Sequence, residues 1–394
     1  MRQADAYRRI DGLLEVRARD HPRRVEPAWS DLLSAIDAAA ARLLAGVETA
    51  AGTEPERLPA FYDRPLFVVG HRKTGTTLLL DLLDGHPDLA TLPGESNHFL
   101  TFLPRVHGLP PDRIAAEAQR WWMLRLISPS GIPPFWALGR PWELPDDPYA
   151  RFTRRLLALA AANSDRDVLG LTAVAISAGD RAAWVEKTPG QEHVLDAILK
   201  RYRRALFVHL VRDPRSVAAA IARLDRSTGQ ATDMVEIGLT VRRSFAAAER
   251  NAGRLGEDRY LVLRYEDLVA APQAAMRRVA GLVGIDWADT LLVPTVGGVE
   301  ATSNSAWAER RVTGEIEGRR LDLWRDELDE RSAELVAGAV GAVGRRLGYD
   351  LPRPRRAGTL FDVVSRRTRL ALGSRRQALQ ARVQKKTFSS AAKP

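Results

Sequence analysis

The sequence predicts an α/β fold in which a parallel β-sheet is flanked by helices. Short apolar runs of strand length alternate with longer stretches whose apolar residues recur at helical spacing. Such an alternation favours parallel strands that are joined by crossover helices. Polar motifs follow directly after the apolar runs, and ligands of parallel sheets bind at the carboxyl ends of the strands. The fold and the position of a site are therefore predicted together.

The first part of the chain, residues 1–60, predicts a helical extension. Apolar residues recur there at helical spacing, for example at Leu32, Leu33, Ile36 and Leu43. The N-terminus has no apolar stretch typical of a signal peptide, and no apolar run reaches the roughly 18 residues of a membrane span. We therefore expect a cytoplasmic protein.

A glycine-bounded loop gives the sheet a more specific form. A short strand leads into a loop between Gly70 and Gly75 and then into a helix that opens on Thr76 and Thr77. The two glycines have P-loop spacing, which predicts a P-loop-NTPase-like sheet. The lysine of a P-loop should follow Gly75, but the lysine of this loop is Lys73. Because N–H groups at a helix start bind anions, we expect the loop to bind a phosphate-like group. We do not expect it to bind the nucleoside triphosphate and Mg²⁺ of an ordinary P-loop enzyme.

Four further strands are predicted along the chain. They lie at residues 89–92, 183–186, 205–211 and 260–264. The last of them is followed by helical sequence through about Val283. The polar motifs of the chain lie at the carboxyl ends of these strands, as a site at one edge of a parallel sheet requires.

Residues 100–182, between the second and third strands, differ from the rest. Four of the nine Trp residues lie here, and prolines are frequent. We expect an irregular helical insertion that binds the acceptor of the reaction. The alternative is that Trp121, Trp122, Trp136 and Trp142 only pack the insertion onto the core.

The composition excludes several classes of function. The chain of 394 residues has no Cys, so disulfides, thiolate metal sites and cysteine nucleophiles are excluded. Its net charge is +10, but residues 353–394 carry twelve Lys and Arg against one acid. The remaining chain is nearly neutral, which argues against nucleic acid as a partner. The basic tail predicts a helix that either contacts the anionic inner face of a membrane or extends into solvent.

Four motifs resemble those of one family, the sulfotransferases that use 3′-phosphoadenosine 5′-phosphosulfate (PAPS). The motifs are the loop at residues 71–77, Glu186–Pro189, Leu210–Ser216 and Leu263–Leu268. They are closest to the motifs of bacterial enzymes and of Golgi carbohydrate and tyrosyl-type enzymes. The resemblance covers residues 64–350 and implies a sulfotransferase domain over residues 61–352.

The resemblance implies a reaction and a co-substrate. PAPS would give its sulfuryl group to a hydroxyl of a carbohydrate, glycolipid or small-metabolite acceptor, by in-line transfer and without a metal. The residues implied to bind PAPS are Arg72, Lys73, Thr74, Gly75, Thr76, Thr77, Arg212 and Ser216. The serine that the family places eight residues after Arg212 is Ala220 here. Arg310, Arg311 and Arg319 either compensate for it or lie on a solvated basic loop.

Glu95, Lys73 and Lys187 are the catalytic residues that the resemblance implies. Glu95 lies in the segment where carbohydrate and tyrosine sulfotransferases carry their catalytic glutamate, and would take the acceptor's proton. His98 is the alternative base, and Glu95 could also be a surface carboxylate. Lys73 would neutralise charge on the leaving oxygen. Lys187 either faces the sulfuryl group or forms an ion pair with Glu186 or Glu95.

Two other functions fit parts of the sequence. A small-molecule kinase would use the same loop, but it would need a lysine directly after Gly75. A module that binds membrane surfaces would use the basic tail, although the nearly neutral body does not support it.

Overall fold

The computed structural model of the chain describes most residues. They are residues 3–19, 27–47, 57–127, 136–227, 229–301, 314–316, 321–353, 361 and 363–366. The chain divides into two compact units. The first, which we call the sheet unit, comprises Met1–Arg212, Ser227–Gly229 and Ala247–Arg320. The second, the C-terminal unit, comprises Asp213–Arg226, Gln230–Ala246 and Leu321–Pro394.

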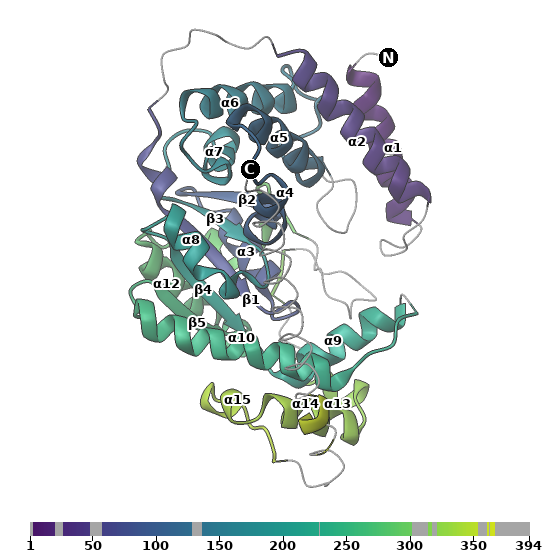
Figure 1. Cartoon of the computed structure of the whole chain (residues 1–394), viewed down its shortest axis with the longest axis vertical. Coiled ribbons are helices and arrows are strands. Elements are labelled where there is room, and N and C mark those ends of the chain that lie inside the picture. Colours follow the sequence, from purple (N-terminus) through teal and green to yellow (C-terminus); the bar gives the residue numbers. More distant parts are fainter. Residues whose placement is uncertain are drawn as a thin grey trace, which may run out of the picture. The chain divides into compact units, whose positions relative to one another are not determined.

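The sheet unit is built around five parallel strands (Figure 1). They are β1 (Pro65–Gly70), β2 (Leu89–Glu95), β3 (Ala183–Lys187), β4 (Leu206–Val211) and β5 (Tyr260–Arg264). Their order in the sheet is β2-β3-β1-β4-β5. The predicted α/β fold with a P-loop-like parallel sheet is thus confirmed, and each predicted strand is present.

The central strand brings several loops together. β1 pairs with β3 on one side and with β4 on the other, in registers that align Val68 with Lys187 and Gly70 with Leu210. All six residues of β1 are buried, as expected for a strand covered on both faces. The loops that follow β1, β3 and β4 therefore leave the sheet next to one another.

Helices cover both faces of the sheet (Figure 1). Leucines of α3 (Thr76–Asp84) and apolar residues of α12 (Pro272–Val283) pack with Leu66, Val68 and Val208 of one face. The other face presents Phe67, Trp184 and Phe207. Its apolar cluster includes residues of α5 (Pro111–Ile127), α6 (Pro148–Ala162), α7 (Val168–Ile176) and α8 (Leu195–Arg201). An outer layer follows, in which α2 (Pro27–Ala45) packs on α5 and α6, and α1 (Gln3–Arg19) packs on α2.

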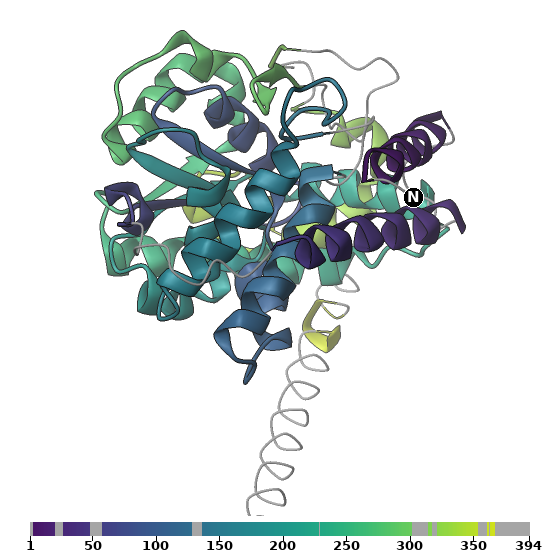
Figure 2. The same ribbon diagram turned by 90° about the horizontal axis from the view of Figure 1, so that it is seen from above.

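The N-terminal helices belong to the sheet unit. α1 and α2 pack against each other, and α2 also packs against α5 and α6 (purple helices in Figures 1 and 2). Leu32 and Ile36 of α2 are buried in the same apolar cluster as the aromatic face of the sheet. The predicted helices are present where the structure describes this region. The boundaries 1–60, 61–352 and 353–394 stay predictions.

Residues 100–182 are more regular than the expected irregular insertion. Three well-formed helices, α5, α6 and α7, occupy most of this stretch, and residues 128–135 lie outside the described residues. Pro111 and Pro148 stand at the first turns of α5 and α6, where proline is tolerated. Trp122 and Trp136 are buried, so these two pack the helices onto the core.

Short elements complete the sheet unit. They are η1 (Ala60–Asp63), a π-helical turn η2 (His98–Phe102), α4 (Leu103–Arg105), η3 (Gln191–His193), α11 (Tyr265–Ala270), η4 (Asp289–Leu292) and the two-stranded β6 (Thr295–Val296) and β7 (Val299–Glu300). No helix among the described residues is both long and apolar enough to cross a membrane.

The C-terminal unit is helical. It contains most of α9 (Pro214–Ser227), the first half of α10 (Met234–Leu255), α13 (Trp324–Glu327), α14 (Glu330–Val340) and α15 (Ala342–Arg346). Val235 and Leu239 of α10 pack with Ala339 of α14. Of the predicted basic tail, only residues 353, 361 and 363–366 are described, and Arg366 pairs with Asp233 at 2.7 Å.

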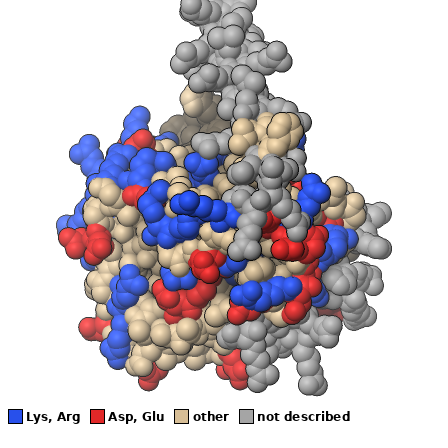
Figure 3. Space-filling model, turned by 90° about the horizontal axis from the view of Figure 1, so that it is seen from below, with Lys and Arg blue, Asp and Glu red and all other residues tan. Residues whose placement is uncertain are grey.

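Charge is mixed on the face of the molecule that Figure 3 presents. Lys and Arg side chains (blue) and Asp and Glu side chains (red) lie side by side among the described residues on that face. The alternation agrees with the nearly neutral charge of the chain outside its tail. A continuous basic stripe of the kind that binds nucleic acid is not seen among the described residues of this face.

A buried histidine beneath the loop predicts how stability depends on pH. Burial lowers the pKa of His209 from 6.5 to about 4, although the charge of Glu192 opposes this shift. His209 is fully buried and shares a hydrogen bond with the Tyr260 hydroxyl (2.7 Å). Between these two pKa values the unfolded chain binds more protons than the native protein. His209 therefore favours the native state above pH 6.5, and this stability is lost as the pH falls toward 4.

Between roughly pH 7 and pH 4, we expect the free energy of unfolding of the wild type to fall by about 3 kcal/mol more than that of His209→Gln. Urea unfolding of both proteins across this range measures the difference. His107→Gln, at an exposed position, is the control and should follow the wild type. Parallel pH profiles for the wild type and His209→Gln would contradict the prediction.

Candidate active site

The loop after β1 is held in shape by hydrogen bonds of its own backbone and of its neighbours. The Thr74 hydroxyl and amide both donate to the His71 carbonyl oxygen, at 2.7 and 3.2 Å. Gly190 N donates to Gly70 O at 3.1 Å, and Gly70 N donates to a carboxylate oxygen of the buried Glu192 at 3.2 Å. Both donors of Thr74 are therefore used within the loop itself.

The start of α3 is open to an anion. Gly75 is its N-cap residue, with φ 97°, and no side chain caps the helix. The first N–H groups of a helix have no acceptor within the helix, so those of Thr76 and Thr77 depend on a ligand or solvent. Lys73 also has a left-handed backbone, with φ 69°. A non-glycine residue in this region is strained by about 1–3 kcal/mol, and such strain is concentrated at functional sites.

Arg212, at the end of β4, lies against this loop. Its guanidinium stacks over the Tyr265 ring, 4.3 Å from the ring centroid, and Nη1 donates to Lys73 O at 3.2 Å. The side chain is 8% exposed, and its Nε atom is buried without a hydrogen-bond partner in the described part of the chain. A buried guanidinium that lacks an acceptor for one of its donors could bind an anionic group.

The other two candidate catalytic residues, Glu95 and Lys187, form an ion pair. β2 and β3 align Glu95 with Lys187, and Lys187 Nζ lies 2.9 Å from Glu95 Oε1. The Lys187 side chain is 3% exposed, whereas that of Glu95 is 37% exposed. Lys187 thus pairs with Glu95. The carboxyl of the preceding residue, Glu186, is bound elsewhere, because successive side chains of a strand point to opposite faces.

Glu186 holds the segment that carries Glu95. Its carboxyl is fully buried and accepts hydrogen bonds from the Ser96 hydroxyl, the Ser96 amide (3.3 Å), the Thr188 hydroxyl (2.6 Å) and the Gln191 amide (2.9 Å). Burial raises the pKa of Glu186, and these hydrogen bonds oppose the shift. Glu186 therefore joins the end of β2 to the turn that follows β3.

Two residues of α5 hold the same segment from outside. Trp121 Nε1 donates to Ser96 O at 2.7 Å, and Arg125 Nε donates to Glu95 O at 2.6 Å. The Arg125 guanidinium stacks on the Trp121 ring at 4.0 Å, and burial lowers its pKa to about 10. It stays charged at neutral pH. Arg125 was not among the predicted site residues. The sequence hint of its position is the spacing of one helical turn from Trp121.

His98, the alternative base, is part of the interior. Its side chain is 2% exposed, and Nε2 lies 2.9 Å from Asp167 Oδ1. Arg201 pairs with the same carboxylate at 2.7 Å. Burial alone would raise the pKa of Asp167, but His98 and Arg201 outweigh it and lower the pKa to about 2. This geometry favours a structural role for His98 and leaves Glu95 as the accessible carboxylate.

A further acid, Asp81 of α3, was also missed. Burial raises its pKa well above the usual range, and the positive charge of Lys187 opposes this shift. In the sequence, Asp81 stands between leucines of α3, and the helical periodicity of the apolar residues does not account for an acid at that position.

The remaining predicted residues are placed as follows. Arg72 is exposed, and its carbonyl oxygen accepts a hydrogen bond from His71 Nδ1 at 2.9 Å. Ser216 belongs to the C-terminal unit, where it is buried and its hydroxyl donates to Leu321 O at 3.0 Å. Ala220 is buried within α9 of the same unit. Arg310, Arg311 and Arg319 lie outside the described residues.

The chain is similar in sequence to two known proteins. The nodulation protein NoeE of Sinorhizobium fredii is 26% identical over 307 residues, which are 72% of this chain and 65% of NoeE, just under two thirds of its length. Protein-tyrosine sulfotransferase A of Caenorhabditis elegans is 24% identical over 313 residues, which are 77% of this chain and 72% of that protein.

Among solved structures, the sulfotransferase domain of the Synechococcus PCC 7002 olefin synthase is similar, with a TM-score of 0.44 and 20% identity. The match covers 77% of this chain and 99% of that domain.

The sequence model of the sulfotransferase family matches residues 65–289, more than half of the chain. The matched stretch runs from β1 to η4 and contains the glycine-bounded loop, Glu95, Lys187 and Arg212. The chain therefore belongs to the sulfotransferase family.

Proposed function

We propose that the protein is a PAPS-dependent sulfotransferase that transfers a sulfuryl group to an acceptor hydroxyl. The observation that carries the proposal is Arg212. It has a buried Nε without a partner among the described residues, and it contacts the carbonyl of Lys73 in the loop. Two anion-binding features, the loop and this guanidinium, therefore adjoin one another at the ends of β1 and β4. PAPS carries anionic groups at both its 5′ and 3′ positions.

The residues present fit such a ligand. The uncapped start of α3, with Thr76 and Thr77, would hold the 5′-phosphosulfate, and Arg212 would hold the 3′-phosphate. When bound, PAPS supplies a sulfuryl group and a leaving oxygen that gains negative charge. Lys73 would stabilise that charge, because a compact ammonium suits a crowded reaction centre. Ser216 as a second 3′-phosphate ligand, and contacts from Arg72, remain part of the proposal.

Glu95 is the proposed general base. Its carboxylate is partly exposed, whereas that of Glu186 is buried and fully hydrogen-bonded. A base must reach the proton that it removes, so exposure favours Glu95. Lys187 would position the carboxylate before the reaction and face the sulfuryl group when the acceptor attacks.

The proposed acceptor bears a hydroxyl and is a carbohydrate, a glycolipid or a small metabolite. The name of the C. elegans relative states that it acts on protein tyrosine, which also presents a hydroxyl. The basic tail would contact an anionic membrane surface and bring the enzyme to a lipid-linked acceptor. The tail lies largely outside the described residues, so its role is proposed from its charge alone.

The first experiment compares nucleotides. Calorimetry should detect binding of adenosine 3′,5′-bisphosphate without Mg²⁺ and much weaker binding of ATP with Mg²⁺. The kinase alternative predicts the reverse order, and it lacks support because Thr76 stands where the P-loop lysine would be. Tight ATP binding with no bisphosphate binding would refute the proposed function.

Glu95→Gln should reduce turnover by at least about 100-fold while the affinity for adenosine 3′,5′-bisphosphate stays nearly unchanged. The amide keeps the shape of the side chain but cannot accept the acceptor's proton. Turnover is measured with labelled PAPS and a panel of hydroxyl-bearing acceptors. Glu143→Gln, at an exposed ion pair with Arg140, is the matched control and should retain full activity. Equal turnover in the wild type and Glu95→Gln would exclude Glu95 as the base.

Gly75→Ala should destabilise the loop and abolish bisphosphate binding. A Cβ at Gly75 would overlap the Tyr265 ring, and the positive φ would strain any L side chain. Gly108→Ala is the matched control, because Gly108 has φ 85° and no atom within 4 Å of the added Cβ. We expect a loss of about 1 kcal/mol in unfolding free energy for Gly108→Ala and at least twice that for Gly75→Ala. Equal losses, with binding retained, would contradict the assignment of the loop.

A further inference from the structure

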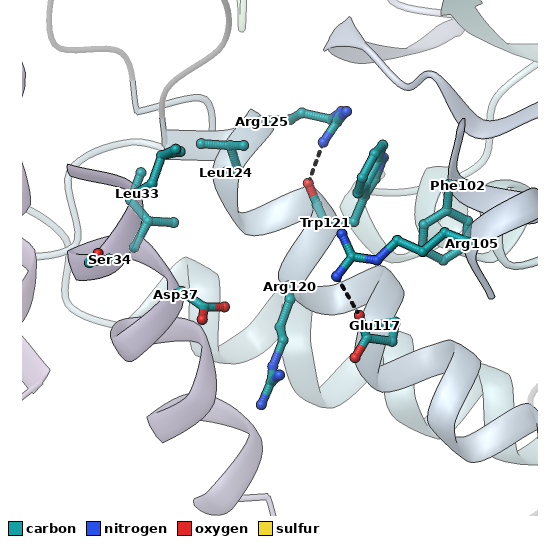
Figure 4. A pocket seen from close by; sticks show the side chains of 11 residues that line it. Leu33, Ser34, Asp37, Phe102, Arg105, Glu117, Arg120, Trp121, Leu124 and Arg125 are labelled. Carbon is teal, nitrogen blue, oxygen red and sulfur yellow. Dashed lines mark hydrogen bonds and ion pairs between the residues drawn. The ribbon is translucent and has the colours of Figure 1, made fainter. Parts of the chain in front are cut away.

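A pocket lies between the N-terminal extension and the helices that follow β2 (Figure 4). Its volume is about 430 Å³, within the range of small-molecule sites. The N-terminal wall comes from α2, and the opposite wall from η2, α4 and α5. The lining residues of α2 are Leu33, Ser34, Ile36 and Asp37. α2 lies before residue 65, so this wall is outside the part of the chain that matches the family.

The lining combines two kinds of surface. One is apolar and is formed by Leu33, Ile36, Phe102 and Leu124, together with the ring of Trp121. The other is a set of ionised side chains with both signs, three of them cationic and two anionic: Arg105, Arg120, Arg125, Asp37 and Glu117. Arg105 and Glu117 are 3.6 Å apart, so two of these charges compensate one another (Figure 4).

This mixture indicates the chemistry of the ligand. Alternating carboxylates and guanidinium groups satisfy hydroxyl groups, which both donate and accept hydrogen bonds. A strongly anionic ligand would meet the carboxylates of Asp37 and Glu117 as well as the arginines. The apolar wall would bury a hydrocarbon portion of the same ligand. An amphipathic molecule with a hydroxyl-rich head fits better than a free phosphate or a purely apolar compound.

The pocket is joined directly to the segment that carries Glu95. Trp121 and Arg125 line the pocket, and the same two side chains donate to the carbonyl oxygens of Ser96 and Glu95. Arg125 Nη1 also bonds Trp121 O at 2.7 Å, so the two side chains form one rigid wall (Figure 4). A ligand in the pocket would therefore lie against the groups that position the proposed base.

We propose that this pocket binds the part of the acceptor that lies away from the reacting hydroxyl, and that the acceptor is a sugar linked to an apolar chain. The inference rests on the proposed function and narrows its acceptor to the glycolipid class. It also gives the N-terminal extension a role, since α2 supplies one wall of the acceptor site.

Two substitutions on α2 test the proposal. Ser34→Trp places a bulky ring in the pocket from an exposed position, which leaves the core intact. Ala45→Trp adds the same ring on the same helix at an exposed position about three turns from Ser34 that does not line the pocket, and is the matched control. The probe is n-octyl β-D-glucoside below its micelle concentration, with D-glucose and octyl phosphate as comparison ligands. Binding is measured by calorimetry on the full-length protein.

We expect octyl glucoside to bind the wild type and Ala45→Trp equally, and to bind Ser34→Trp about tenfold more weakly or not at all. Glucose and octyl phosphate should each bind the wild type more weakly than octyl glucoside. Equal binding to Ser34→Trp and the wild type would overturn the proposal. Tighter binding of octyl phosphate, or no binding of octyl glucoside to the wild type, would also overturn it.

Adenosine 3′,5′-bisphosphate is titrated into the same three proteins. Binding to all three shows that they are folded and that the nucleotide site is intact. If the bisphosphate binds and octyl glucoside does not, the pocket proposal fails while the proposed function stands. If the bisphosphate does not bind the wild type, the proposed function itself fails, and the glycolipid assignment fails with it.

Discussion

The buried carboxyl of Glu186 is the interaction on which the geometry of the site depends. It is fully buried near the carboxyl end of β3, where an ionised group without partners would be strongly destabilising. Hydrogen bonds from Ser96, Thr188 and Gln191 compensate for its burial, and each comes from a segment that the site uses. Among the described residues, Gln191 is the donor to Oε2, so its loss would leave a buried acceptor unsatisfied, whereas Oε1 accepts from both Ser96 and Thr188. The segment after β2 and the turn after β3 are therefore fixed relative to each other, and with them Glu95 and its partner Lys187.

The order of the strands explains how the residues of the candidate site come together. Because β1 lies between β3 and β4, the loop, Lys187 and Arg212 leave neighbouring strands at the same edge of the sheet. The anion-binding groups need no long loops to meet. Much of the strain is concentrated at Lys73, whose left-handed backbone is held by the hydrogen bonds around it. A rigid sheet can support such local strain, and a flexible loop could not.

The helices on the aromatic face of the sheet connect this edge to the rest of the sheet unit. α5 contacts α2 on one side and the Glu95 segment on the other, through Trp121 and Arg125. Among the described residues, α5 thus links the N-terminal extension to the segment that carries Glu95.

The sequence by itself determined the parallel sheet, the anion-binding loop and the positions of the strand-end motifs. These features depend on local patterns: apolar runs, glycine spacing and the polar residues that follow each strand. Only the tertiary structure decided that Lys187 pairs with Glu95, that His98 is bound to Asp167 in the interior, and that Arg125 donates to the backbone carbonyl of Glu95. It also showed that α2 forms one wall of a pocket. Such pairings join residues distant along the chain, and packing selects them among many acids and arginines of similar local context.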